Sequence, residues 1–300
     1  MMNFGVSLGT MALRSPLIAA AGTVGSVYDF ADVEAFRLYG AAVAKSVSHE
    51  PWPGRQPPRM APAGNGMLNS IGIQNPGIDE WRSRMPELSA LPVPVWGSAV
   101  GADAAEFAIV AKGLGAAGVQ AVEVNLSCPN LEEGTMFALN PTAAAAVVGA
   151  VRAATDLPIG AKLSPNSEDI VAVADAVAGA GADFVVLANT VWGLGIDLET
   201  RRPKISGIVG GYSGPPVKPI ALRCVWEVAS ALDIPIVGCG GIRSGEDVIE
   251  YLMAGASAVE IGTVHFAEPR AGKRILRAVD DWCRRRGIDS LGELTGSAHG

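Results

Sequence analysis

The 300-residue chain has little of what metal centres, disulfide frameworks and nucleic-acid surfaces are built from. It contains three histidines and four cysteines, and Cys128, Cys224, Cys239 and Cys283 show neither metal-ligand spacing nor a disulfide framework. We therefore expect no metal site and no iron–sulfur cluster in this chain, and a reducing, cytoplasmic location. Acidic residues outnumber Lys and Arg by 30 to 23, which disfavours nucleic acid as a partner.

The sequence also lacks a long hydrophobic run. Leu17–Ala21 is too short to span a bilayer, and the N-terminus has no charged segment followed by an apolar one and a cleavage site. We therefore expect no membrane partner. Hydrophobic residues nonetheless form 49% of the chain, which is enough for one large core, and residues 1–300 are predicted to form a single domain.

Eight short apolar runs recur along the chain, and Ala-rich segments of helical spacing lie between most of them. Because the runs are continuous rather than alternating, they predict parallel strands that are buried on both faces. Eight strand–helix units predict an α/β fold of the (β/α)8 TIM-barrel type. An open doubly wound sheet is disfavoured, since no Gly-x-Gly-x-x-Gly follows the first strand. The predicted strands are Leu17–Thr23, Ala41–Val47, Val93–Val100, Ala121–Ser127, Ile159–Ser164, Phe184–Thr190, Pro235–Gly241 and Ala258–Thr263.

The clearest predicted helices are Ala104–Ala117, Pro141–Ala154, Ser167–Gly179, Pro219–Leu232 and Glu246–Ala254. Two stretches do not fit the repeat: His49–Arg84, which is rich in Pro, Gly and Asn, and Leu194–Pro216. We interpret both as long loops inserted at the C-terminal face of the barrel. Loops of that length in a compact domain are usually lids or binding loops.

Polar residues gather at the predicted strand ends, where the chemistry of a TIM barrel lies. They are cations, amides and glycines, and we find there neither the carboxylate pair of a glycosidase nor clustered metal ligands. Lys45 and Lys162 lie within apolar strands, so each needs a negative partner. Gly240-Gly241 and Gly262-Thr263 leave backbone N–H groups accessible to a phosphate, and the predicted helix N-cap at Ser244–Asp247 also favours an anion.

Cys128 follows the end of a predicted strand and lies between Asn125 and Asn130. A thiol in such polar surroundings is well placed to move a proton on a small polar ligand. A small packing residue is the alternative, since free cysteines are often buried.

Taken together, these motifs resemble the dihydroorotate dehydrogenase family, and specifically the catalytic subunit of its NAD-linked, heteromeric subclass (class I, subclass B). The resemblance covers nearly the full length. The motifs that carry it are Lys45-Ser46, Asn65–Gly77, Asn125–Asn130, Lys162–Asn166, Asn189-Thr190, Gly211–Pro215, Gly240-Gly241 and Gly262-Thr263.

The resemblance implies oxidation of (S)-dihydroorotate to orotate in de novo pyrimidine (UMP) biosynthesis, with Cys128 as general base and hydride transfer to FMN. The residues it implies for binding FMN are Ala21, Gly22, Lys45, Ser46, Ser98, Asn125, Lys162, Leu187, Gly214, Gly240, Gly241, Gly262 and Thr263. Those implied for binding dihydroorotate or orotate are Lys45, Asn69, Ser70, Ile71, Gly72, Ile73, Asn125, Asn189 and Thr190.

The family resemblance also implies partners. Because the chain has no cysteine cluster and no nucleotide fingerprint, transfer of electrons to NAD would need a second subunit. The resemblance implies that this subunit carries FAD and an iron–sulfur cluster. That subunit would assemble around a homodimer of this chain. A chain acting alone would use a small soluble oxidant or a quinone. Two other functions stay open: oxidation or reduction of another dihydropyrimidine, and a non-catalytic barrel that binds a phosphate-bearing ligand.

Overall fold

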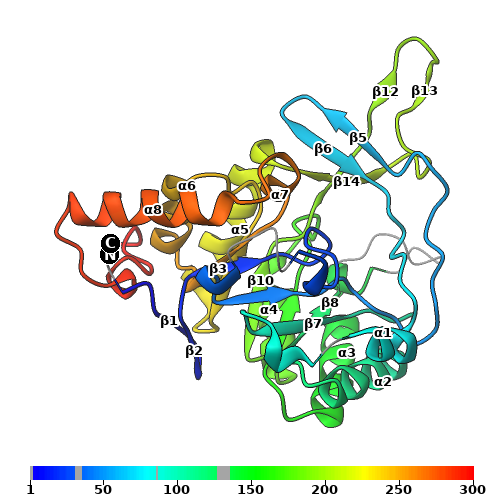
Figure 1. Ribbon diagram of the computed structural model, residues 1–300, viewed down its shortest axis with the longest axis horizontal. Coiled ribbons are helices and arrows are strands. Elements are labelled where there is room, and N and C mark those ends of the chain that lie inside the picture. The colour runs from blue at the N-terminus through cyan, green and yellow to red at the C-terminus, as the bar shows by residue number, and fades with distance from the viewer. Residues whose placement is uncertain (1–2, 31–35, 86, 127–135) are drawn as a thin grey trace.

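The computed structural model describes residues 3–30, 36–85, 87–126 and 136–300. Eight parallel strands close into a barrel with helices outside it, which confirms the predicted TIM-barrel fold (Figure 1). Each barrel strand lies within one of the eight predicted apolar runs. The barrel strands are β3 (Leu17–Ala19), β4 (Ala41–Val43), β7 (Val95–Ala99), β8 (Ala121–Asn125), β9 (Ile159–Lys162), β10 (Phe184–Leu187), β15 (Ile236–Cys239) and β16 (Ala258–Ile261).

The helices are amphipathic segments that begin at polar caps. The side chains of Asp103, Asn140, Asp169 and Ser244 each accept a hydrogen bond from a backbone N–H in the first turn of the following helix. In the described ranges, no helix combines the length and hydrophobicity that crossing a lipid bilayer requires. The α-helices are α1 (Ile78–Arg84), α2 (Ala104–Ala116), α3 (Pro141–Ala154), α4 (Ile170–Gly179), α5 (Lys218–Ala231), α6 (Gly245–Met253), α7 (Val264–Ala267) and α8 (Ala271–Arg284). The 3₁₀ turns are Tyr28–Phe30, Phe36–Leu38, Leu88–Ala90, Phe137–Leu139, Pro215–Val217 and Leu291–Glu293.

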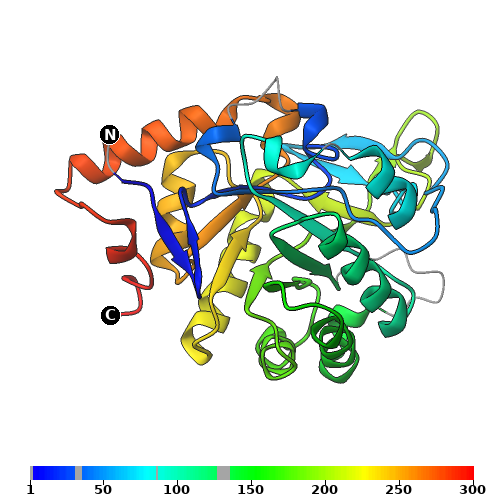
Figure 2. The same ribbon diagram turned by 60° about the horizontal axis from the view of Figure 1, so that its bottom comes forward.

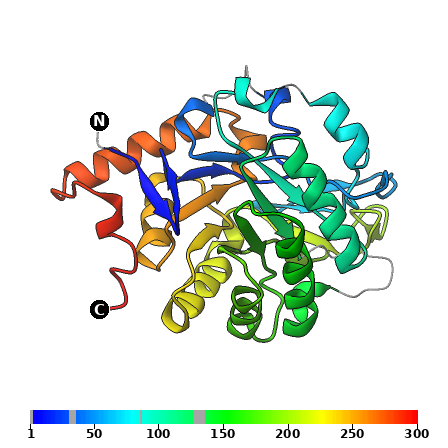
Figure 3. The same cartoon turned by 90° about the horizontal axis from the view of Figure 1, so that it is seen from below.

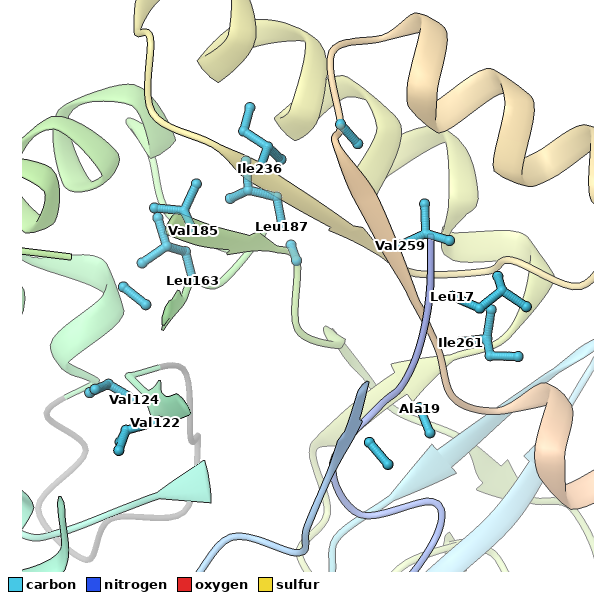
Figure 4. Packing of buried hydrophobic residues seen from close by; sticks show 14 of the residues in the cluster. Leu17, Ala19, Val122, Val124, Leu163, Val185, Leu187, Ile236, Val259 and Ile261 are labelled. Carbon is cyan, nitrogen blue, oxygen red and sulfur yellow. The ribbon is translucent and has the colours of Figure 1, made fainter. Parts of the chain in front are cut away.

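Side chains alternate between the two faces of each barrel strand. Val122 and Val124 of β8 belong to the larger core cluster, which fills the layer between strands and helices (Figure 4). Phe184 of β10 belongs instead to a second cluster inside the barrel, where its ring centroid lies 5.2 Å from that of Trp96. Apolar side chains therefore fill one end of the barrel interior.

An N-terminal hairpin closes this apolar end. Strands β1 (Val6–Leu8) and β2 (Met11–Leu13) pair in antiparallel fashion, and the hairpin lies against the barrel strands (Figures 2 and 3). Leu8 and Leu13 pack on the interior cluster that contains Trp96 and Phe184. Any polar chemistry in the barrel is thereby confined to the opposite end.

The prediction that residues 49–84 and 194–216 are loops is wrong in part. They contain α1, the small hairpin β12–β13 and three strands of a four-stranded antiparallel sheet in the order β11-β14-β6-β5, whose fourth strand, β11, comes just before residue 194 (Figure 1). Leu68 pairs with Tyr212, so the two segments stabilise one another across a long separation in sequence. The additional strands are β5 (Met60–Ala63), β6 (Gly66–Asn69), β11 (Val191–Gly193), β12 (Ile196–Asp197), β13 (Arg202–Pro203) and β14 (Gly210–Ser213).

The tight barrel interior gives a first prediction. A Cβ atom added at Gly160 of β9 would overlap the buried ring of Phe184, whereas one at Gly149 of α3 has no atom within 4 Å. We expect Gly160→Ala to lower the free energy of unfolding by about 1–3 kcal/mol through overpacking. Gly149→Ala should raise it by about 0.5–1 kcal/mol, since alanine favours the helix. Urea unfolding monitored by tryptophan fluorescence measures both, and equal stability of the two variants contradicts this account.

Candidate functional site

A cavity of about 760 Å³ opens at the carboxyl ends of the barrel strands, beneath strands β6 and β14. This volume suits a cofactor and a small substrate together. Most of the predicted site residues, which come from widely separated positions in the sequence, line this one cavity. They are Ala21, Gly22, Lys45, Ser46, Asn69, Ile71, Gly72, Ile73, Asn125, Lys162, Asn189, Thr190, Gly214, Gly240, Gly241, Gly262 and Thr263.

Three other predicted residues lie behind the cavity wall. Ser98 is fully buried, and its Oγ shares a 2.9 Å hydrogen bond with Ser46 Oγ. Leu187 is buried in the outer core cluster. Ser70 Oγ is also buried and lies close to Gly207, a position where an added Cβ atom would overlap it. Cys128, the predicted base, lies outside the described residues.

A row of hydrogen-bonded amides and hydroxyls forms one wall. Asn189 Nδ2 donates to Asn125 Oδ1 at 3.2 Å, and Asn125 Nδ2 donates to Ser46 Oγ at 3.3 Å. Asn69 Nδ2, which also lines the cavity, donates to the Gly211 carbonyl and ties the end of β6 to strand β14. Because each amide is held by a neighbour, its remaining donors and acceptors have fixed directions. Such a wall suits a planar ligand that carries both donors and acceptors.

The floor of the cavity is charged. Lys162 Nζ lies 2.6 Å from Glu260 Oε2 and 3.7 Å from Glu123 Oε1, and all three side chains are buried. Burial lowers the pKa of Lys162, but the two neighbouring glutamates outweigh that effect and raise it. Burial, followed by the charge of Glu260, raises the pKa of Glu123 well above its usual range. Lys162 therefore has the negative partner that its position in an apolar strand required.

These two glutamates correct the sequence-based inference that the strand ends hold no carboxylate pair. Glu123 and Glu260 lie inside apolar strands rather than after them, so the polar residues that follow the strands do not reveal them. A signal was present, because both belong to the strand face opposite their outward-facing neighbours Val122, Val124, Val259 and Ile261.

The other end of the cavity is built from glycines. Gly240 and Gly241 have φ angles of 134° and 71°, and a Cβ atom on either would lie 2.7 Å from an atom of α5. The predicted N-cap is confirmed, because Ser244 Oγ accepts from Asp247 N at 3.2 Å. However, Asp247 Oδ2 already accepts from the backbone N–H groups of Arg243 and Ser244, so these donors are not available to an anion. The lining glycines at 240, 241 and 262 are the better candidates for a phosphate.

Comparison with known proteins gives a consistent result. The family model of dihydroorotate dehydrogenase matches residues 5–282. The chain is 42% identical over 298 residues to "Dihydroorotate dehydrogenase B (NAD(+)), catalytic subunit" of Trichlorobacter lovleyi, covering 98% of both chains. It is 39% identical to the protein of the same name in Alkaliphilus metalliredigens, covering 99% of both. A crystal structure of DHODH from Eimeria tenella with ferulenol aligns with a TM-score of 0.85 at 19% identity, covering 99% of this chain and 89% of that one. This last likeness shows the fold.

The Asp247 cap gives a prediction that depends on pH. Hydrogen bonds from Lys218 and the backbone N–H groups of Arg243 and Ser244 outweigh burial and lower the pKa of the Asp247 carboxyl. We expect Asp247→Ala to destabilise the protein by about 0.5–2 kcal/mol at pH 7. Because the folded-state pKa is lowered, this stabilisation is complete above the ordinary value of about 3.9 and disappears as the pH falls through the folded value.

Urea unfolding of wild type and Asp247→Ala at a series of pH values from 7 downward measures the effect. Ser244→Ala removes the other half of the same capping box without removing a titratable group, so its cost should change much less with pH. A constant difference between wild type and Asp247→Ala down to the acid transition contradicts the assignment.

Proposed function

Because the chain belongs to the dihydroorotate dehydrogenase family, we propose that it oxidises (S)-dihydroorotate to orotate in de novo pyrimidine biosynthesis. FMN in the cavity would be the immediate electron acceptor. The observation that carries the proposal is the single cavity that joins a glycine-lined end, a buried lysine and a row of fixed asparagines. Residues 1–300 would form one FMN-binding barrel domain in the cytoplasm, as the use of cysteine also suggests.

The residues present fit FMN. Backbone N–H groups at Gly240, Gly241, Gly262 and Thr263 would hold the phosphate, at the barrel position where phosphates commonly bind. Lys162 rises from the floor between β8 and β10, where its charge would face the flavin ring. When bound, the flavin supplies a hydride acceptor, which no amino-acid side chain can provide.

The residues of the opposite wall fit dihydroorotate. Its ring carries an imide and a carboxylate, which need paired donors and acceptors and one cation. Asn69, Asn125 and Asn189 offer the amides, and Lys45 lines the same cavity and offers the cation. We propose that these residues, with Thr190, hold the ring flat against the flavin position.

Cys128 would be the general base. Among the described residues, Leu126 follows the cavity residue Asn125 and accepts a 3.0 Å backbone hydrogen bond from Ala138. The thiolate would take the proton from the ring carbon adjacent to the carboxyl-bearing carbon. The C–H electron pair left behind becomes the new ring double bond as a hydride departs from the carboxyl-bearing carbon. A free thiol has a pKa of about 8.5, so the base is more available at slightly alkaline pH.

Replacing the base tests this role. We expect Cys128→Ala to retain bound FMN but to slow flavin reduction by dihydroorotate by about 10²- to 10⁴-fold, the usual worth of a positioned base. Anaerobic stopped-flow absorbance of the flavin measures the rate in a single turnover. Cys224→Ala is a matched control, because Cys224 is buried on α5 within the helix–barrel core.

An unchanged rate in Cys128→Ala would remove that residue from the mechanism while leaving the substrate assignment intact. Stopped-flow measurement of flavin reduction by different dihydropyrimidines also tests which substrate the protein oxidises. Faster reduction by a neutral dihydropyrimidine than by dihydroorotate would favour the alternative of a different dihydropyrimidine enzyme.

The physiological partner follows from the relatives, which are named as catalytic subunits of an NAD(+) enzyme. We propose that a second subunit, carrying FAD and an iron–sulfur cluster, passes electrons from FMN to NAD. The homodimer of this chain stays a prediction. Contacts with either the second subunit or another copy of this chain could use six exposed apolar side chains between positions 192 and 209. They are Trp192, Leu194, Ile196, Leu198, Ile208 and Val209.

Purification of the tagged chain from its source tests the partner. We expect a co-eluting brown subunit that contains iron and FAD, and dihydroorotate-dependent NADH formation only in the complex. If the chain purifies alone and reduces a quinone or a small soluble oxidant at full rate, the NAD-linked assignment is wrong.

A further inference from the structure

The floor of the cavity contains two acidic side chains but only one basic side chain. Two carboxyl groups, Glu123 of β8 and Glu260 of β16, converge on the single ammonium group of Lys162. The exposed fractions of the three residues are 0%, 1% and 5%, so water cannot compensate for the imbalance. All three also line the cavity, together with Cys239 of β15. The imbalance therefore lies directly beneath the proposed flavin position.

The hydrogen bonds of the two glutamates are incomplete as well. Among the described residues, both Glu123 oxygens and Glu260 Oε1 are buried without a donor. The two carboxyl groups converge on one ammonium group, with Glu260 Oε2 at 2.6 Å and Glu123 Oε1 at 3.7 Å from Lys162 Nζ. An ionised carboxylate only accepts hydrogen bonds, whereas a protonated carboxyl group can also donate one. Two ionised carboxylates in this position would also repel each other out of reach of water.

We propose that Glu123 and Glu260 hold one proton between them and act through Lys162 as positioning residues that set the reduction potential of bound FMN. The floor then carries one ammonium, one carboxylate and one carboxylic acid, and its net charge is zero. The role toward FMN rests on the function proposed above. The shared proton follows from the glutamates and the lysine alone.

The geometry assigns the proton mainly to Glu123. Glu260 is the closer partner of Lys162, at 2.6 Å against 3.7 Å for Glu123. Burial and the charge of Glu260 raise the pKa of Glu123, in agreement with that assignment. Of the other groups near the cluster, Cys239 is neutral at pH 7, because burial raises its pKa to about 12. Tyr251 of α6 is neutral too, since burial raises the pKa of its hydroxyl, which donates to the Gly240 carbonyl. Lys45 lines the same cavity from beyond β4.

Because the proton is shared, replacing either glutamate by glutamine leaves the other as the carboxylate that balances Lys162. In Glu123→Gln, Glu260 remains the carboxylate that pairs with Lys162. In Glu260→Gln, Glu123 loses its proton and takes that place. Only the double variant leaves the ammonium group without a carboxylate, and a cation near the flavin favours its electron-rich reduced state.

Redox titration of the FMN-loaded protein against a reference dye measures the potential without using dihydroorotate. We expect each single variant to have nearly the wild-type potential, and the double variant Glu123→Gln/Glu260→Gln to have a clearly more positive one. Equal and additive positive shifts from both single variants would mean that both groups are ionised, and would overturn the shared proton. An unchanged potential in the double variant would overturn the role toward FMN.

Asp280→Asn provides a matched control. Asp280 is a buried carboxylate of α8 that pairs with Arg284. Its replacement should lower stability while leaving the flavin potential unchanged, which separates a general loss of packing from an effect on the cavity floor.

Infrared spectroscopy tests the proton directly in the wild-type protein. After labelling with ¹³C-glutamate, at a pH of about 8 where exposed glutamates are ionised, we expect one isotope-shifted carboxylic-acid band that either single variant abolishes. Absence of the band in wild type overturns the proposal. The band and the titration do not depend on the substrate. A flavin that dihydroorotate fails to reduce would therefore refute the proposed function and leave the shared proton standing.

Discussion

The closure of eight parallel strands is the constraint on which every other feature of the molecule depends. In a closed barrel, alternate side chains must face an interior that no solvent reaches from the side. The sequence satisfies this constraint differently at the two ends. Trp96 and Phe184 fill one end together with the hairpin residues Leu8 and Leu13, and Glu123, Lys162 and Glu260 occupy the other. Apolar filling at one end therefore confines the chemistry to the opposite end.

The second layer of organisation is the antiparallel sheet above the barrel mouth. Its strands lie in or beside two excursions and are only three or four residues long, so none of them is stable alone. Pairing of β6 with β14 fixes the loop that follows Asn69, and the Asn69 side chain bonds to Gly211 within the same pairing. The wall of the cavity is thus held by contacts between segments that are distant in sequence. A substrate loop can be positioned in this way without lengthening the barrel strands.

Much of this arrangement could be predicted from local sequence. Continuous apolar runs indicate the eight barrel strands, and cavity residues such as Lys45, Lys162 and Gly240 lie in or at the ends of these runs. Helix α1 and strands β5, β6 and β14 were not predicted, because turn-forming residues hide them and their stability comes from distant partners. The hydrogen bond between Ser98 and Ser46 could not be predicted either, since only the folded chain brings the two hydroxyl groups together.

The glutamates of the floor show a different kind of failure. Glu123 and Glu260 are obvious charges in apolar strands, but their meaning depends on which strands face one another across the barrel. Strand β8 is a direct neighbour of β9. Strand β16 is separated from β9 by β15 and β10, so Glu260 reaches Lys162 only across the interior. Pattern along the chain gives the inward face of each strand, whereas closure of the barrel decides which inward side chains meet.

The apolar and charged ends of the interior also depend on each other energetically. Two unit charges 4 Å apart interact by about 1 kcal/mol in water but by about 4 kcal/mol at an effective dielectric constant of 20. An exposed pair such as Arg223 and Glu227 is therefore worth at most about 1 kcal/mol. Breaking a buried pair of the Lys162–Glu260 kind costs about 3–5 kcal/mol. The apolar filling below keeps water from the floor, and this exclusion lets one lysine act strongly on a ligand above it. The same exclusion requires that the charge of that lysine be balanced within the barrel.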